Sequence, residues 1–137
     1  MSEPGHLTLT VVTPERSVVD KASCDAVSLP GELGELGILP GHTPLVALLG
    51  VGRVAWTDGG KKTAVAVRGG FVEVAGDAVR VLADLAAEKD SIDVTAARQD
   101  RAEDHVRRLN VVGNEQLDAV NDDIAFAEAK IAVAQGG

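Results

Sequence analysis

The chain has 137 residues and a net charge of −8, and no segment of it is basic enough to neutralise the phosphates of a nucleic acid. An anionic membrane surface would repel it, and no apolar run approaches the roughly 20 residues that span a bilayer, which argues against direct membrane insertion. Aromatic residues make up 2% of the chain, so the core must consist of aliphatic side chains, which offer few large anchors for a ligand pocket.

Residues 1–87 have the pattern of a β-structure. Apolar and polar residues alternate with period 2 along three runs, and two shorter valine-rich runs come after them: 7–11, 53–57, 62–68, 71–74 and 79–83. This period places alternate side chains on opposite faces of a strand, so that one face can be buried. Turn residues separate the runs, among them Gly69 and Gly70 between the third run and the fourth. Many short strands with frequent turns predict an all-β sandwich or barrel.

Residues 88–137 are rich in alanine and charged residues and contain no proline. Asp90, Ser91 and Asp93 offer an N-cap and first-turn acids for a first helix that is predicted to run to about Leu109. Asn114 is predicted to cap a second helix after a stop at Gly113. Each helix has an expected apolar stripe: Val94, Ala97, Ala102, Val106 and Leu109 in the first, and Leu117, Val120, Ile124, Ala127 and Ile131 in the second.

We expect the two stripes to meet in an antiparallel helical hairpin. Alanine buries little apolar area, so the hairpin gains little beyond the entropy lost in ordering it. The hairpin is therefore predicted to be marginally stable alone and able to detach from the β-structure.

The most informative segment, residues 31–45, reads Gly-Glu-Leu-Gly-Glu-Leu-Gly-Ile-Leu-Pro-Gly-His-Thr-Pro-Leu. Three glycines at three-residue spacing allow turns and a close approach to a neighbour. Pro40 and Pro44 stiffen the second half of the segment and remove two N–H donors, so we expect an ordered, exposed docking loop.

This segment resembles the signature G-x-x-G-x-x-G-I/V-x-P-G-H-x-P of the epsilon subunit of bacterial F-type ATP synthases, the counterpart of the mitochondrial delta subunit. Other parts of the chain are similar to the strands of that family: residues 7–14 with Val18 and Val19, 67–74, and 79–84. The resemblance implies an α+β fold, in which an N-terminal antiparallel β-sandwich, residues 1–87, is followed by a C-terminal two-helix antiparallel hairpin, residues 88–137.

The resemblance also implies a function and partners. A member of this family is a non-catalytic subunit of the central stalk, at the cytoplasmic face of the bacterial cell membrane. Its sandwich docks on the gamma subunit and the c-ring and couples ion-driven rotation to ATP synthesis, and its hairpin contacts the catalytic alpha and beta subunits transiently. The residues expected at the subunit interface are Glu32, Gly37, Leu39, Pro40, Gly41, His42, Thr43 and Pro44.

Two further roles of the hairpin are implied by family members. In some members Ile-Asp begins a nucleotide-binding motif, which Ile92 and Asp93 match, but Ala96 stands where the motif has arginine. We therefore predict no cofactor, with regulatory ATP as the alternative. Members that restrain ATP hydrolysis present basic side chains, here Arg98, Arg101, Arg107 and Arg108. The acids of the second helix are predicted to form a solvated face: Glu115, Asp118, Asp122, Asp123 and Glu128.

Other chemistry is weighed against simpler interpretations. His42 lacks an accompanying nucleophile motif, so an interface role is preferred to catalysis. Glu32, Glu35 and Glu73 match no metal-binding spacing, and no metal site is predicted. The segment 59–63 lacks the order of a phosphate loop and is predicted to be a hairpin turn. Cys24, the single cysteine, is predicted to be a small strand residue in a reduced cytosolic protein without a secretion signal. A free-standing ligand-binding module and a hydrolytic enzyme are the rival hypotheses.

Overall fold

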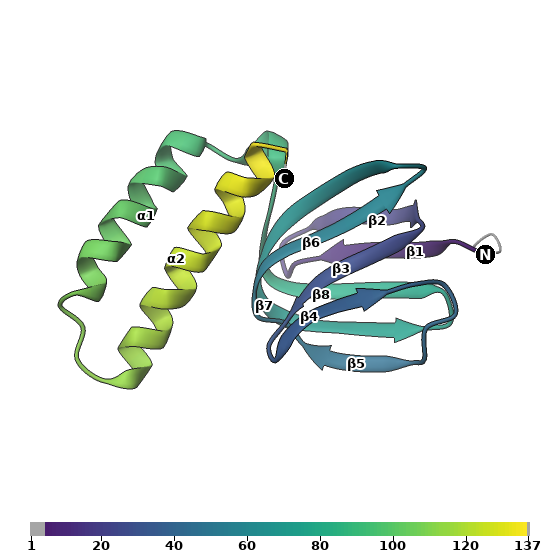
Figure 1. The fold of residues 1–137 in the computed structure, drawn as a ribbon, viewed down its shortest axis with the longest axis horizontal. Helices are drawn as coiled ribbons and strands as arrows, with labels where there is room; N and C mark the ends of the chain where they lie inside the picture. The colour runs from purple at the N-terminus through teal and green to yellow at the C-terminus, as the bar shows by residue number, and fades with distance from the viewer. Residues whose placement is uncertain (1–4, 137) are drawn as a thin grey trace.

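Eight strands and a helical hairpin make up the computed structural model, which describes residues 5–136 (Figure 1). The strands are β1 (Leu7–Val12), β2 (Ser17–Cys24), β3 (Ala26–Gly31), β4 (Gly34–Ile38), β5 (Leu45–Leu48), β6 (Val51–Asp58), β7 (Lys61–Ala75) and β8 (Ala78–Glu88). A short 3-10 turn, η1 (Lys89–Ser91), leads into α1 (Val94–Arg108) and α2 (Asn114–Ala134). The predicted fold class is confirmed, and the predicted boundary after residue 87 falls one residue before the end of β8.

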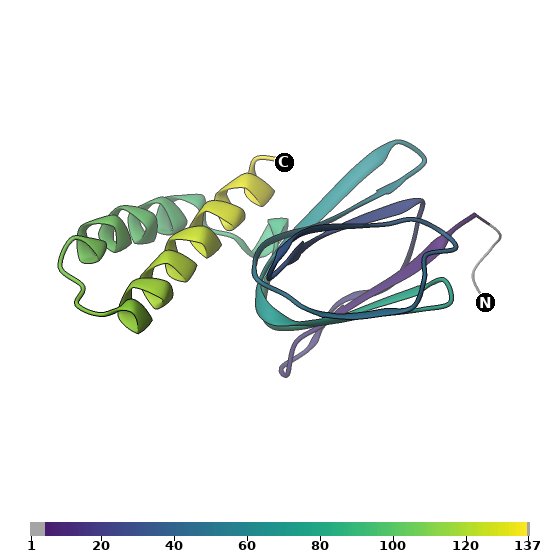
Figure 2. The same ribbon diagram turned by 60° about the horizontal axis from the view of Figure 1, so that its bottom comes forward.

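The strands are hydrogen-bonded in the order β2-β1-β8-β7-β6-β3-β4, with β5 paired to β7 outside this path. The neighbouring strands pair in antiparallel fashion, except β1 and β8, which run parallel. The sandwich is therefore antiparallel apart from this one pair, which the sequence pattern did not indicate. The two layers of the sandwich can be seen apart in Figure 2.

The valine-rich runs on either side of Gly69 and Gly70 form one strand, β7, and not two strands with a turn between them. Both glycines have positive φ, +69° and +107°, and pairing with β8 continues on both sides of them. Before the glycines β7 pairs with β6, and after them it pairs with β5. Glycine tolerates the backbone conformation that a bend in a strand needs, so one long strand serves both layers.

The core of the sandwich consists of fully buried leucine and valine side chains from β1, β3, β6, β7 and β8. In β1 the burial alternates from residue to residue, as the period-2 pattern predicted. The single tryptophan, Trp56, lies at the margin of this cluster and is also buried. The expectation of an aliphatic core is confirmed.

The caps of the two helices are partly as predicted. The Asp93 carboxylate accepts a hydrogen bond from the backbone N–H of Ala96 at 3.1 Å, which confirms Asp93 as the cap of α1. The cap of α2 is Gly113, at a φ of +93°, and Asn114 is the first helical residue. The predicted Asn114 cap is therefore wrong by one position.

The apolar stripe predicted for α1 is wrong. Ala97 is buried, whereas Val106 and Leu109 are 61% and 83% exposed. Nine residues separate Ala97 from Val106, which at 3.6 residues per turn places them on opposite sides of the helix. The side of α1 that carries Ala97 continues instead through Arg101 and Asp104, both half-buried.

α2 carries the predicted stripe and a second apolar face. Four members of the stripe are buried, and the fifth, Leu117, is half-buried: Val120, Ile124, Ala127 and Ile131 are the buried four. The second face, Ala129 and Val133, packs against Ala66 of β7 in a small cluster that also includes Phe126 and Ile92. α2 therefore lies between α1 and the sandwich, as Figure 1 shows.

Candidate docking surface

The segment predicted to be a docking loop is largely β-structure. Residues 31 to 34 close a tight turn between β3 and β4, where a Cβ on Gly31 would lie 2.4 Å from the carbonyl oxygen of Gly34. β4 is a strand at the end of the sheet order, and the irregular part is confined to residues 39–44 before β5. Leu36 is half-buried and Ile38 is buried, so alternate residues of β4 face inward, as in a regular strand.

The loop between β4 and β5 is ordered by its own hydrogen bonds. The N–H of His42 donates to the carbonyl of Leu39 at 3.1 Å, and the N–H of Gly41 donates to the Asp77 carboxylate at 3.2 Å. Asp77 lies in the turn between β7 and β8, so this hydrogen bond connects the β4–β5 loop to the β7–β8 turn. His42 is half-buried, with Nδ1 2.6 Å from the carbonyl oxygen of Thr43.

The predicted interface residues lie along the β4–β5 region and do not form one cluster. Glu32 is exposed, and its backbone N–H donates to Leu48 at the end of β5. The rest lie along β4 and the loop toward its far end; the exposed ones are Gly37, Leu39, Gly41, Thr43 and Pro44, and Pro40 is half-buried. Glu32 and His42 therefore lie at opposite ends of this region.

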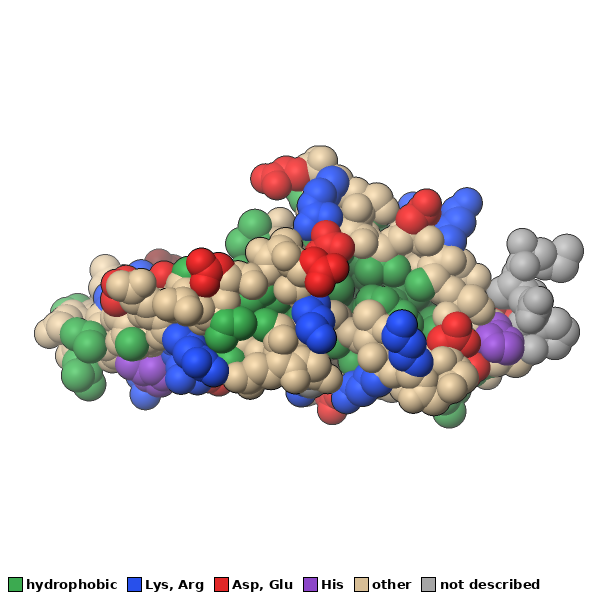
Figure 3. All heavy atoms as spheres, turned by 90° about the horizontal axis from the view of Figure 1, so that it is seen from above, with side chains coloured by type: hydrophobic (Ala, Val, Ile, Leu, Met, Phe, Trp, Pro, Cys, Tyr) green, Lys and Arg blue, Asp and Glu red, His purple; other side chains and the backbone are tan. Residues whose placement is uncertain are grey.

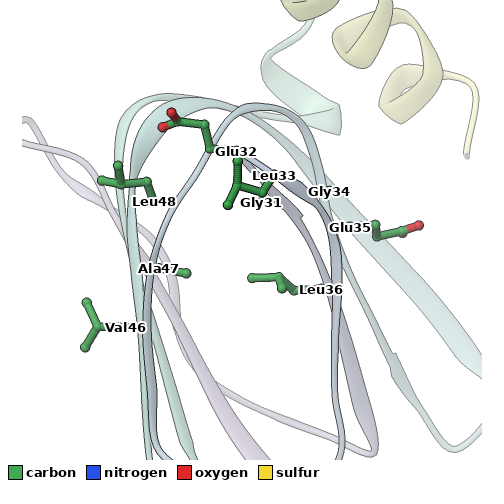
Figure 4. Close-up of a pocket in the computed structure, with 9 residues that line it drawn as sticks. All are labelled: Gly31, Glu32, Leu33, Gly34, Glu35, Leu36, Val46, Ala47 and Leu48. Carbon is green, nitrogen blue, oxygen red and sulfur yellow. The ribbon is translucent and has the colours of Figure 1, made fainter.

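Three apolar side chains that the prediction missed extend this region. Leu33 is fully exposed at the β3–β4 turn, and Val46 and Leu48 are 70% and 61% exposed on β5. Between β4 and β5, Leu36 and Ala47 point toward each other in a hollow of about 430 Å3 (Figure 4). We define the β4–β5 surface as Leu33, Leu39, Val46 and Leu48.

The β4–β5 surface has the features of a contact site. β4 pairs only with β3 and β5 only with β7 among the named strands, so each leaves an edge without a strand partner. Exposed apolar residues on edge strands favour association, which monomeric proteins normally suppress with charge. The exposed apolar face of β5 could have been predicted from the sequence. The continuous apolar run from Leu45 to Leu49 leaves no polar residue for the outer face of that strand.

The four arginines predicted to act in inhibition differ in their surroundings. Arg107 forms ion pairs with Asp123 and, at 3.5 Å, with Asp104, and Arg108 donates to Asn121 at 3.3 Å. These two are engaged within the hairpin. Within residues 5–136, Arg98 and Arg101 form no ion pair, and Arg98 is exposed.

Asp123 joins the hairpin to the sandwich. Its carboxylate accepts hydrogen bonds from Arg107 of α1 and from Arg68 of β7. Burial by itself raises the pKa of Asp123, but the hydrogen bonds from Arg107 and Arg68 outweigh it and hold that pKa below its usual range. We call this group of three residues the clasp. The prediction that the acids of the second helix form a solvated face is therefore wrong for Asp123.

The residues considered for nucleotide binding have structural contacts. Ile92 packs against the cluster between α2 and the sandwich, and the Asp93 carboxylate is used as the cap of α1. Ala96 is exposed beside a hollow that Phe126 and Lys130 also line, with Lys130 Nζ 4.9 Å from the centre of the Phe126 ring.

The other candidate groups have the simpler roles predicted for them. Gly59 and Gly60 both have positive φ and form the two-residue turn between β6 and β7, as a type I′ hairpin requires. Cys24 ends β2 and is buried; burial, together with the nearby Asp25 and Asp58, raises the pKa of its thiol to about 11. A thiol that stays protonated is a poor nucleophile.

Helices long and apolar enough to cross a membrane are absent from the described part of the chain. Acidic and basic side chains are interspersed over the face seen in Figure 3.

Comparison with known proteins identifies the family. The family model described as the β-sandwich domain of the ATP synthase delta/epsilon chain matches residues 6–89. The ATP synthase epsilon chain of Solibacter usitatus is 40% identical over 132 residues, covering 96% of this chain and 97% of the relative. That of Desulforamulus reducens is 47% identical over 123 residues, covering 88% and 89%.

Solved structures have the same fold. A chain of the Euglena gracilis mitochondrial ATP synthase, in a structure of OSCP, F1 and the c-ring, superposes with a TM-score of 0.78 at 20% identity and covers 98% of this chain and 84% of that one. A chain of the Tetrahymena thermophila central stalk and c-ring gives 0.61 at 14% identity, covering 95% and 99%. The match of both the sandwich and the hairpin, together with identities of 40% and more over most of its length, shows that the chain belongs to the ATP synthase epsilon chain family.

Proposed function

We propose that this chain is a non-catalytic subunit of the central stalk of an F-type ATP synthase. It docks on the gamma subunit and the c-ring and helps to couple ion-driven rotation of the ring to ATP synthesis. Membership of the epsilon chain family over nearly the whole length carries this proposal. The chain acts as part of a membrane-bound complex, at the cytoplasmic face of the bacterial cell membrane.

The β4–β5 surface is the part of the sandwich that docks. Its exposed apolar side chains lie on two edge strands and beside a loop held by hydrogen bonds, so the contact area is largely preformed. Preformed contact areas lose little entropy on binding. The predicted interface residues from Glu32 to Pro44 lie in or beside this surface and complete the contact.

Co-purification with the gamma subunit tests this assignment. Wild type should bind gamma, and the double variant Leu33→Asp with Val46→Asp should bind at least tenfold more weakly, because two carboxylates would be desolvated in the contact. Leu109→Asp, at an apolar residue of the hairpin tip that is 83% exposed, is the control and should bind like wild type. Equal binding by all three proteins would reject the β4–β5 surface as the contact.

We further propose that the hairpin restrains ATP hydrolysis when it leaves the sandwich. The clasp and the small cluster around Ala66 hold the hairpin on the sandwich. Of the four arginines, the exposed Arg98 is the one most available to the catalytic subunits, and the half-buried Arg101 would follow once the hairpin opens. Hydrolysis by the assembled complex, compared between the full chain and a chain ending after residue 87, is the test. Faster hydrolysis with the shortened chain supports restraint, and an unchanged rate rejects it.

No resident cofactor is part of the proposed function. The Asp93 carboxylate is already engaged as a cap, and Ala96 supplies no cation for a phosphate. Adding ATP to the isolated chain should therefore leave its thermal midpoint unchanged.

A further inference from the structure

Three potential metal ligands meet at the end of the sandwich where β1 begins. His6 precedes β1, Asp25 lies between β2 and β3, and Asp58 is the last residue of β6. One ligand atom from each of the three lies within 4.8 Å of the other two. No sequence pattern indicates this group, because its members are 19 and 33 residues apart and belong to no spacing motif.

The group is oriented by the fold. Nε2 of His6 lies 3.3 Å from Oδ1 of Asp25, and Nδ1 is enclosed, which leaves Nε2 as the nitrogen that faces the carboxylates. Oδ2 of Asp25 accepts the N–H of Gly59 at 3.0 Å, so Oδ1 is directed to His6. The N–H of Asp25 donates to the carbonyl of Thr57 at 2.7 Å, which fixes Asp25 beside the end of β6.

The electrostatics of this corner favour a cation. In the part of the chain that the structure covers, neither Asp25 nor Asp58 has an ion pair with lysine or arginine, although Lys61 lies opposite Asp58 in the β6–β7 register.

We propose that His6, Asp25 and Asp58 bind a divalent zinc-type cation through Nε2 and one carboxylate oxygen each. Ligands about 2.0–2.1 Å from a tetrahedral zinc ion lie about 3.4 Å apart, which the His6–Asp25 pair already matches. Asp58 is exposed at a turn, and its side chain rotates to supply the third oxygen. Water fills the remaining position, and one imidazole with two carboxylates is a donor set that zinc accepts.

The bound ion would link the start of β1, the β2–β3 corner and the β6–β7 turn. It would therefore stabilise the end of the sandwich by binding only the folded chain. This site shares no residue with the β4–β5 surface or with the clasp. If the chain does not bind zinc here, the proposed function is therefore unaffected.

Titration of Zn2+ into the full chain without an affinity tag, followed by calorimetry and thermal unfolding, tests the site. We expect one ion per chain and a rise in the thermal midpoint with Zn2+. His6→Gln and Asp58→Asn should each weaken binding at least tenfold and remove the rise. His105→Gln, a histidine variant on α1 outside the group, is the control and should behave like wild type.

A second readout separates loss of ligands from loss of fold. Proton NMR should show the imidazole resonances of His6, and not those of His42 or His105, shifting on addition of one equivalent of Zn2+. Circular dichroism checks that each variant is folded. If His6→Gln unfolds, Asp58→Asn, at an exposed turn, provides the test of binding instead. Absence of binding, equal affinity in the two site variants and wild type, or equal shifts at all three histidines would overturn the proposal.

Discussion

Arg68 of β7 and Asp123 of α2 form an ion pair across 55 residues of sequence, and each side chain is 28% exposed. Asp123 also pairs with Arg107, so one carboxylate fastens both helices of the hairpin to the sandwich. Charge pairs at a surface contribute little one by one, but a shared, half-buried carboxylate with two guanidinium donors contributes more.

Replacing Asp123 should loosen the hairpin. Asp123→Asn removes the charge that Arg68 and Arg107 share, and we expect the free energy of hairpin opening to fall by about 1 kcal/mol. Hydrogen exchange of the α2 amides measures this, and it should be about five times faster in the variant. Asp122→Asn, at the exposed neighbouring position, is the control; equal exchange in the two variants would show that the clasp does not hold the hairpin.

The clasp also makes docking of the hairpin depend on pH. Because the docked pKa of Asp123 is lowered from its ordinary value of 3.8, the carboxylate stabilises docking fully when the pH is well above 3.8. This contribution is lost as the pH falls below 3.8 and through the lower pKa of the docked state. Exchange of the α2 amides, corrected for intrinsic rates, should therefore be constant from pH 7 to 5 and show extra opening below about pH 4. Asp123→Asn should lack this extra opening, and the same acid response in both proteins would contradict the assignment.

A charge introduced into the apolar contact between α2 and β7 should loosen the hairpin more than the loss of the clasp does. Ala129→Glu would place a carboxylate against the fully buried Ala66, at a cost of about 2 kcal/mol or more. Limited proteolysis should then cut the hairpin of this variant much faster than that of wild type. Ala119→Glu, at an exposed position on the same helix, should be cut at the wild-type rate.

Gly70 should be the least replaceable glycine of the sandwich. A Cβ there would lie 1.9 Å from the carbonyl oxygen of Leu82, at a φ of +107°, so Gly70→Ala should cost more than about 3 kcal/mol or prevent folding. Gly76 has a φ of +58° with open space around it, and Gly76→Ala should cost only about 1 kcal/mol. Chemical denaturation of both variants gives the comparison, and similar losses would show that the close approach at Gly70 is relieved by backbone movement.

The sequence predicted the parts of the fold that depend on local patterns. Period-2 alternation located β1 and β6, and the Asp93 cap and the stripe through Ile124 located the two helices. The family signature at residues 31–45 identified the region of the candidate site. These features depend on neighbours within one element, which a single sequence displays directly.

The errors arose where distant contacts decide the outcome. Gly69 and Gly70 look like a turn, but pairing with β8 on both sides keeps β7 continuous. The sequence pattern predicts Val106 on the inner face of α1. In the structure Ala97 faces inward and Arg107 pairs with Asp123, and Val106 lies on the exposed side. Hydrophobic side chains consequently lie exposed at the hairpin tip, the left end of Figure 3. Residues such as Arg68 and Asp123 carry no local signal of their pairing.

Coupling in a reconstituted enzyme tests the central claim most directly. An F-type ATP synthase depleted of its epsilon subunit, placed in lipid vesicles and supplied with this chain, should regain ATP-driven ion pumping. The Leu33→Asp, Val46→Asp double variant should leave pumping low, whereas Leu109→Asp should restore it. Pumping restored equally by the double variant, or by none of the three proteins, would contradict docking of the sandwich on the rotor through the β4–β5 surface.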